Sequence, residues 1–252
     1  MSTTNVFGLH AVQSVLQNNP MSVTRLLLSD SRKDKRLGEI ETLAKSRSIP
    51  IDRTSPKELQ KLIGEERHQG VVAVCRAREV LSEPELLKLV MSLDKAFLLI
   101  VDGVTDPHNL GAILRTADAA GVDCVIAPRS GSVGLTPVVR KVASGAAETI
   151  AFCPVANLAR TLAELKTLGI WFYGASDKAE SDYSAVDFTG SVGLVLGAEG
   201  KGLRRLTQEA CDGLISIPMA GSVSSLNVSV AAGICLFEVV RQRRLDHSTG
   251  TQ

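Results

Sequence analysis

The chain has 252 residues, of which 44% are hydrophobic and 22% charged, so it has ample apolar material for one large domain or two smaller ones. No apolar run reaches the ~18 residues of a membrane span, and the N-terminus lacks the basic-then-apolar order of a signal peptide. These features exclude an integral membrane protein and predict a cytoplasmic one. The five cysteines are odd in number and widely spaced, so neither a disulfide framework nor a C-x-x-C metal site is indicated.

The net charge of +1 conceals an asymmetry along the chain. Residues 1–78 contain 13 Lys and Arg against 8 Asp and Glu, a balance of +5, whereas the remainder carries 15 basic and 19 acidic residues, a balance of −4. A basic N-terminal third fits contact with an anionic partner such as nucleic acid. A solvated surface with a chance excess of cations explains the same numbers.

The first 75 residues are predicted to alternate between helix and strand, which indicates a small α/β domain. Helices are expected at Val6–Leu16, Ser31–Lys45 and Ser55–Ile63, and strands at Arg25–Leu28, Ile49–Asp52 and Gly70–Val74. The polar turn at residues 65–70 places His68 and Gln69 just before the last strand, where they could meet a base or a phosphate. A purely structural turn fits this pattern equally well.

A charged, proline-containing stretch at residues 76–84 and a short helix at Glu85–Leu93 interrupt this pattern. We therefore divide the chain into a domain at 1–78, a linker at 79–95 and a second domain at 96–252. The second domain is predicted to alternate strands with helices, the strands lying at Phe97–Asp102, Cys124–Ile126, Ile170–Tyr173, Gly193–Leu196 and Leu214–Ile217. Continuous apolar runs such as FLLIV indicate strands covered on both faces, hence a mostly parallel sheet between helices.

Three segments that follow strands could carry chemistry, because open α/β sheets usually bind ligands at the carboxyl ends of their strands. In the first, residues 101–121, Asn109 and Arg115 lie on a small apolar helix capped by Asp106. An arginine in an apolar setting needs a partner. Arg115 could pair with Asp118 or Glu199, or it could hold a phosphate.

The second segment, residues 193–206, is a buried strand followed by Gly197, Glu199, Gly200 and Gly202. Glycines at this point allow the backbone to approach a ligand closely. The order G-x-x-G-x-G and its late position do not match a dinucleotide-binding fingerprint.

The third segment, residues 214–243, combines a short strand, a Pro/Gly/Ser loop and a long apolar helix. Ser222, Ser224 and Ser225 are candidate caps for this helix, whose apolar stripe is expected at Leu226, Val230, Ile234 and Phe237. The helix contains Gly233, which suggests close approach of another backbone, and a subunit contact is one explanation.

These segments carry a resemblance. The sequence from Asn109 to Arg115, NLGAILR, the loop GAEGKG at 197–202 and IPMAGSVSSLNVS at 217–229 resemble the three ordered motifs of the SpoU/TrmH family of RNA ribose 2′-O-methyltransferases. In addition, GLHAV at 8–12 and HQGVVA at 68–73 resemble the L30e-like substrate domain of one branch. The likeness implies an α/β SPOUT domain with a C-terminal trefoil knot, preceded by that small domain, and a homodimer that binds S-adenosylmethionine in the knot.

The resemblance also implies roles for residues that match the motifs. Backbone groups around Leu196, Gly197, Ile217, Met219 and Leu226 would hold the cofactor, and the catalytic group would comprise Asn109, Arg115, Glu199, Ser225 and Asn227, with Arg115 contributed in one arrangement by the second subunit. Because a guanidinium is not a base, Arg115 would fix the adjacent phosphate and stabilise the developing alkoxide, Glu199 would orient it, and Ser225 or a phosphate oxygen would relay the proton. The N-terminal candidates for RNA binding are His10, Arg32, Lys33, His68 and Gln69.

The expected substrate is a guanosine in 23S rRNA, in a ribosome precursor, because the N-terminal match favours the branch with that activity. Methylation of another rRNA or tRNA nucleotide stays open, since the catalytic motifs are shared. Two further alternatives are a dinucleotide-dependent enzyme, against which the missing fingerprint argues, and a non-catalytic RNA-binding module. The second of these leaves the glycine-rich strand ends unexplained.

Overall fold

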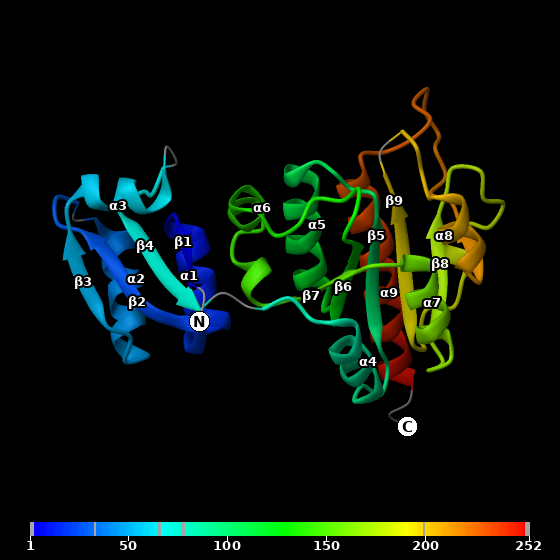
Figure 1. Ribbon diagram of the computed structural model, residues 1–252, viewed down its shortest axis with the longest axis horizontal. Coiled ribbons are helices and arrows are strands. Elements are labelled where there is room, and N and C mark those ends of the chain that lie inside the picture. The colour runs from blue at the N-terminus through cyan, green and yellow to red at the C-terminus, as the bar shows by residue number, and fades with distance from the viewer. Residues whose placement is uncertain (1–2, 33, 65–66, 77–78, 199, 250–252) are drawn as a thin grey trace. The chain divides into compact units, whose positions relative to one another are not determined.

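A computed structural model describes residues 3–32, 34–64, 67–76, 79–198 and 200–249. Internal contacts divide the chain into two units, one formed by Met1–Glu79 with Pro137–Thr149 and the other by Val80–Thr136 with Ile150–Gln252. Each unit has its own sheet (Figure 1). No helix in the described ranges has the length and apolar character needed to span a bilayer.

The first unit is built on a four-stranded sheet. Its strands run in the order β1 (Thr3–Phe7), β4 (Val71–Arg76), β2 (Val23–Ser29) and β3 (Ile51–Thr54). The β2 and β3 strands are parallel, and the other neighbours are antiparallel. Helices α1 (Leu9–Asn18) and α2 (Lys35–Ser46) share an apolar core with Leu26 and Leu28, whereas α3 (Pro56–Ile63) packs on Leu27. Alternate residues of β2 therefore face opposite layers, as a two-residue strand period requires.

The predicted helix at Val6–Leu16 was wrong at its start, because β1 occupies residues 3–7 and α1 begins only at Leu9. Gly8 separates the two elements with φ +89°, a conformation open mainly to glycine. The side chain of Gln69 then accepts a hydrogen bond from the Leu9 N–H at 2.9 Å. The start of α1 is therefore fixed by a residue 60 positions away, which local periodicity does not reveal.

The second unit contains a six-stranded sheet in which every neighbouring pair is parallel. The strand order is β10 (Gly213–Ile215), β8 (Trp171–Ala175), β9 (Val192–Gly197), β5 (Phe97–Asp102), β6 (Cys124–Pro128) and β7 (Ala151–Val155). Every residue of β5 is buried, so the prediction of a mostly parallel sheet covered on both faces is confirmed. Strand β7 was not predicted from the sequence.

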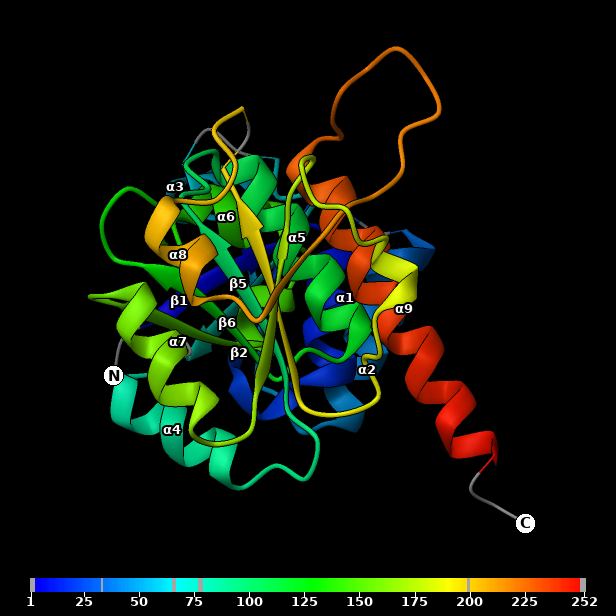
Figure 2. The same ribbon diagram turned by 90° about the vertical axis from the view of Figure 1, so that its right-hand side faces the viewer.

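Two groups of helices cover this sheet. On one face, α4 (Glu83–Met91), α7 (Leu158–Lys166) and α8 (Arg205–Ala210) pack on a core that includes Leu98 and Ile100. The other face carries α5 (Pro107–Ala120) and α9 (Val228–Thr249), which lie against each other (Figure 2). Leu86 and Val90 of α4 belong to this core, although α4 falls within the segment interpreted as a linker. A short helix, α6 (Pro137–Val142), belongs to the first unit.

Helix α9 differs from its prediction in its cap. Asn227, rather than a serine, precedes the helix, and its Oδ1 accepts the Ser229 N–H at 2.9 Å. Of its apolar positions, Val230 and Phe237 are about half exposed, whereas Val228, Ala232, Cys235, Leu236 and Val239 are buried. A helix that is apolar nearly all round gives no periodic signal for the face that packs. Gly233 lies beside Thr116 of α5, and a Cβ there would make ordinary contact at 3.7 Å, so close packing within the chain does not require the glycine.

Candidate active site

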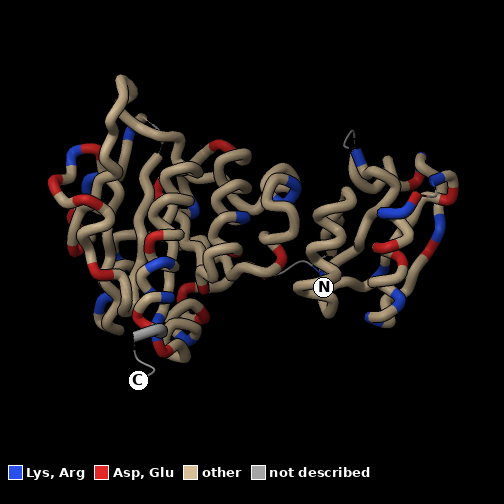
Figure 3. Tube along the Cα trace, turned by 180° about the vertical axis from the view of Figure 1, so that it is seen from behind, with Lys and Arg blue, Asp and Glu red and all other residues tan. Residues whose placement is uncertain are grey.

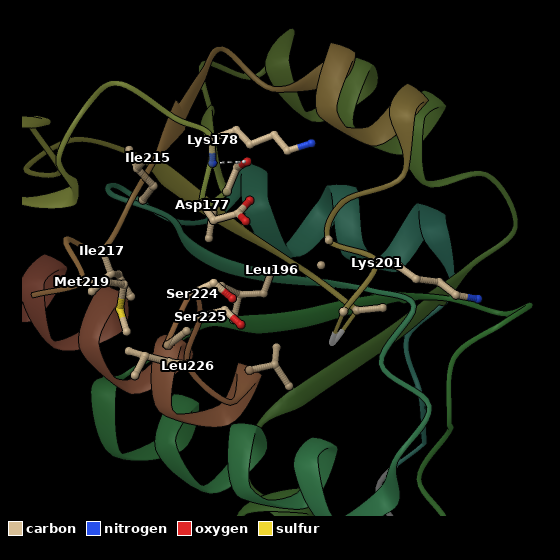
Figure 4. Close-up of a pocket in the computed structure, with 18 residues that line it drawn as sticks. Asp177, Lys178, Leu196, Lys201, Ile215, Ile217, Met219, Ser224, Ser225 and Leu226 are labelled. Carbon is tan, nitrogen blue, oxygen red and sulfur yellow. Dashed lines mark hydrogen bonds between the residues drawn. The ribbon is translucent and has the colours of Figure 1, made fainter. Parts of the chain in front are cut away.

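A cavity of about 370 Å³ lies at the carboxyl edge of the second sheet, where the loops after β8, β9 and β10 meet the first turn of α9 (Figure 4). Parallel strands present their carboxyl ends at one edge, so segments distant in sequence converge there. The five residues expected to hold the cofactor all border this cavity: Leu196, Gly197, Ile217, Met219 and Leu226. Ser225, a predicted catalytic residue, borders it as well.

The turn after β9 forms one wall of the cavity. Ala198 and Gly202 exchange two backbone hydrogen bonds of 3.1 and 2.8 Å, which fold the chain back on itself. Gly197 makes this possible, because a Cβ at that position would lie 2.1 Å from the carbonyl carbon of Gly202. Gly200 and Gly202 have positive φ, as tight turns of this kind require. The glycines predicted to bring backbone close to a ligand therefore shape the wall itself. Glu199 lies outside the described residues.

The loop that follows β8 was not among the segments predicted to carry chemistry. Ser176, Asp177 and Lys178 border the cavity across from Ser224 and Ser225, and Asp177 brings a carboxylate to it (Figure 4). This loop contains no glycine motif. Its signal was the predicted strand at 170–173, whose carboxyl end had to lie at the same edge as the others.

Asn109 and Asn227 are brought together by the packing of α5 on α9. The Nδ2 of Asn227 donates to the Oδ1 of Asn109 at 3.0 Å, joining residues 118 positions apart. Asn109 is nearly buried and lines a second cavity next to the first. Two of the five predicted catalytic residues are therefore in direct contact.

Arg115 is not part of this cluster in its own chain. Its side chain is exposed, since the buried face of α5 is formed by residues such as Asn109, Ile113 and Ala117. It borders neither cavity. The helix turns this position to solvent, so Arg115 is not in an apolar setting within its own chain. Its pairing with Asp118, with Glu199 or with a phosphate stays a prediction.

The predicted RNA-binding residues of the first unit mostly have structural contacts. Arg32 donates to the Gln69 carbonyl oxygen at 2.6 Å, and the Nδ1 of His68 accepts the Gly70 N–H at 3.0 Å. Burial, followed by the nearby Arg32 cation, lowers the pKa of His68, so this imidazole is neutral at pH 7. These contacts close the turn at 67–70. His10 is exposed on α1 and borders a cavity together with Arg67 and Gln69, and Lys33 lies outside the described residues.

The surplus positive charge of the first unit is partly neutralised by neighbours. Arg53 and Lys45 both pair with Glu41, at 2.6 and 2.9 Å, and Arg25 pairs with Asp52 at 3.4 Å. Figure 3 shows the corresponding alternation of blue and red along this unit. Among the described residues of this unit, carboxylates therefore interrupt the excess of cations. In the ranges that the structure describes, no group of three or more His, Cys, Asp and Glu side chains could hold a metal ion.

Comparison with known proteins decides the family. Residues 96–237, more than half of the chain, match the SpoU rRNA Methylase family. The chain belongs to this family. Residues 5–81 additionally match the RNA 2′-O ribose methyltransferase substrate binding family.

Sequence similarity to related proteins covers almost the whole length of this SpoU methylase. A 23S rRNA (guanosine-2′-O-)-methyltransferase RlmB of Shewanella oneidensis is 52% identical, covering 95% of this chain and 97% of the relative. A protein of the same name from Pseudomonas putida is 50% identical, with the same coverage. Among solved structures, the SpoU methyltransferase AviRb from Streptomyces viridochromogenes, in complex with AdoMet, superposes with a TM-score of 0.75 and 26% identity, covering 96% of this chain and 91% of AviRb.

Proposed function

We propose that this SpoU methylase transfers a methyl group from S-adenosylmethionine to the ribose 2′-OH of a guanosine in 23S rRNA. The observation that carries the proposal is the identity of about half of all positions, along nearly the whole chain, with relatives named for that reaction. Such a substrate places the reaction in the cytoplasm and favours a ribosome precursor as the partner.

The cavity at the carboxyl edge fits the proposed cofactor. Its volume of about 370 Å³ lies within the range of about 300–1,000 Å³ that is typical of small-molecule sites. Asp177 offers a negative charge to a cationic ligand. The cofactor would be held largely through backbone groups of the predicted residues Leu196, Gly197, Ile217, Met219 and Leu226. When bound, S-adenosylmethionine supplies an electrophilic methyl sulfonium.

The residues of the chain then have to align the ribose and handle its proton. Asn109 and Asn227, which are in contact, would orient the sugar, and Asn109 borders the second cavity. Alignment alone can lower a barrier by several kcal/mol. The Ser225 hydroxyl borders the cavity and is our candidate for relaying the 2′-OH proton, with a phosphate oxygen as the alternative. Glu199 would orient Arg115 through a charge-assisted pair.

Arg115 would act on the site of a partner subunit. In its own chain it is exposed and borders neither cavity, so the role expected of it requires a second copy. Helix α9 offers a surface for that copy, because Val230, Phe237 and Leu245 form an exposed apolar stripe. We therefore propose a homodimer formed through α9. The trefoil knot implied by the family resemblance stays a prediction.

The decisive experiment maps 2′-O-methylation in ribosomal RNA from cells lacking the gene. We expect one guanosine of 23S rRNA to lose its methyl group and the purified protein to restore it with labelled S-adenosylmethionine. Label found only in tRNA, or at another rRNA nucleotide, would support the alternative substrates instead. Cofactor binding without methylation of any RNA would refute the proposed activity.

A further inference from the structure

Next to the proposed cofactor cavity lies a second cavity of about 490 Å³, between the loops that follow β5, β6 and β9. The two cavities share the wall formed by Ala198, Lys201 and Gly202, together with Val228. Asn109 borders the second cavity. A ligand in it would therefore lie across one thin turn from a methyl donor held in the first.

Arg204 is the most firmly held cation of this second cavity. It interacts with Asp102, the last residue of β5, whose side chain is fully buried. The Asp102 Oδ2 accepts the Arg204 backbone N–H at 3.0 Å, and its Oδ1 lies 3.4 Å from the Arg204 Nε, an ionic contact without a direct hydrogen bond. The Arg204 Nη2 also donates to the Ser130 carbonyl oxygen at 3.3 Å.

Two glycines make room for the Arg204 guanidinium. A Cβ at Gly131 would lie 2.5 Å from the Arg204 Nη2, and one at Gly103 would lie 3.8 Å from it. Both glycines have positive φ, so other residues would be strained there as well. The loops after β5 and β6 thus accommodate this side chain, yet half of the side chain remains exposed.

We propose that this cavity binds an RNA phosphate next to the target ribose, with Arg204 as the contacting residue and Asp102 as the residue that positions it. The inference rests on the proposed function. The buried carboxylate attracts the guanidinium, and the Ser130 carbonyl oxygen accepts one of its N–H groups. The other N–H donors can form the paired hydrogen bonds that phosphate accepts. Lys201 adds a second cation to the same wall. Besides Asp102, the acidic side chain among the described lining residues is Asp106, whose Oδ1 accepts the His108 N–H at 2.9 Å.

The test compares Arg204→Gln with Arg205→Gln in the full-length enzyme. Arg205 is a matched control, because it is the next residue, is exposed, pairs with Glu209 on α8 and borders neither cavity. For Arg204→Gln we expect the KM for RNA to rise about tenfold or more, the salt dependence of RNA binding to weaken by about one phosphate contact, and the Kd for S-adenosylmethionine to stay within about twofold. Arg205→Gln should match the wild type in all three.

A second measurement starts with the wild-type enzyme, so its first result does not depend on the folding of Arg204→Gln. RNA fragments carrying an uncharged methylphosphonate on either side of the target nucleoside are compared with unmodified RNA. We expect one substitution to raise the wild-type KM by about the same factor as Arg204→Gln, and to have no further effect in that variant.

The outcomes separate this inference from the proposed function. A wild-type enzyme that methylates no RNA refutes both. Two outcomes would refute only the phosphate site. One is normal methylation with an unchanged RNA KM in Arg204→Gln. The other is that the uncharged linkage raises the KM equally in the wild type and in the variant. A weakened cofactor Kd with an unchanged RNA KM would show that Arg204 merely supports the shared wall, and would also refute it.

Discussion

Replacing Gly197 with alanine should disable the proposed cofactor site without unfolding the protein. The new Cβ would lie 2.1 Å from the Gly202 carbonyl carbon and 2.4 Å from the Leu203 nitrogen, whereas ordinary contact begins near 3.4 Å. The turn at 198–202 must therefore move by about 1.3 Å, the difference between 3.4 and 2.1 Å. This turn walls both cavities, so we expect at least a tenfold rise in the Kd for S-adenosylmethionine, about 1.4 kcal/mol.

The loss of turnover should be larger than the loss of affinity, because a misplacement of about 1 Å near reacting groups can cost about 100-fold. Isothermal titration calorimetry measures the Kd, and single-turnover methylation of RNA measures the rate. Gly221→Ala is the matched control. It lies in the exposed loop after β10, has no atom within 4 Å of a built Cβ and does not have a positive φ. A folded Gly197→Ala protein that binds the cofactor as tightly as Gly221→Ala would refute this account of the wall.

Further predictions concern catalysis, capping, association and thiol reactivity. Arg115→Lys should lose most turnover yet keep its cofactor Kd, because lysine lacks the planar fork of donors; near-normal turnover would contradict the role assigned to Arg115. Asn227→Ala removes the cap of α9 and the hydrogen bond to α5, so chemical denaturation should show a loss of about 2 kcal/mol, whereas Asn227→Asp, which keeps the capping oxygen, should lose less. Phe237 of α9 is 47% exposed, and Phe237→Arg should shift the mass in sedimentation velocity towards the monomer, while Leu206→Arg on α8 should not; equal masses would rule out the α9 interface. Burial raises the pKa of Cys235 from 9.0 to about 12, so the contribution of this thiol to stability is complete below pH 9 and is lost as the pH rises towards 12. Iodoacetamide at pH 8 should accordingly modify Cys235 only after unfolding, which peptide mass spectrometry can check.

Local sequence patterns were sufficient for the centre of the second unit. The run FLLIVD predicted β5 to the residue, because an unbroken apolar stretch bounded by a turn is typical of a strand buried on both faces. The glycines around 197–202 marked a close backbone approach, since a missing side chain is itself a local feature. These patterns lie within single segments and need no knowledge of what packs against them.

Local sequence patterns gave wrong or missing predictions where a contact with another element determines the structure. The β7 strand contains Pro154, which argues against a central strand, and it is tolerated because β7 lies at the edge of the sheet. The start of α1 depends on Gln69, and the buried face of α9 depends on α5. Each case involves a contact between residues far apart in sequence.

Arg115 and Arg204 show the same difference between local patterns and long-range contacts. In the sequence, Arg115 lies in a motif on the helix after β5, and Arg204 follows a glycine-rich turn. A functional role was predicted only for Arg115. The tertiary structure turned Arg115 to solvent and seated Arg204 on Asp102, 102 positions away. The sequence thus determined which strands end in loops able to bind a ligand, because strand and turn propensities are local. Only the packing of the sheet decided which charges meet there, because a buried carboxylate selects its cation by position in space rather than by position in the chain.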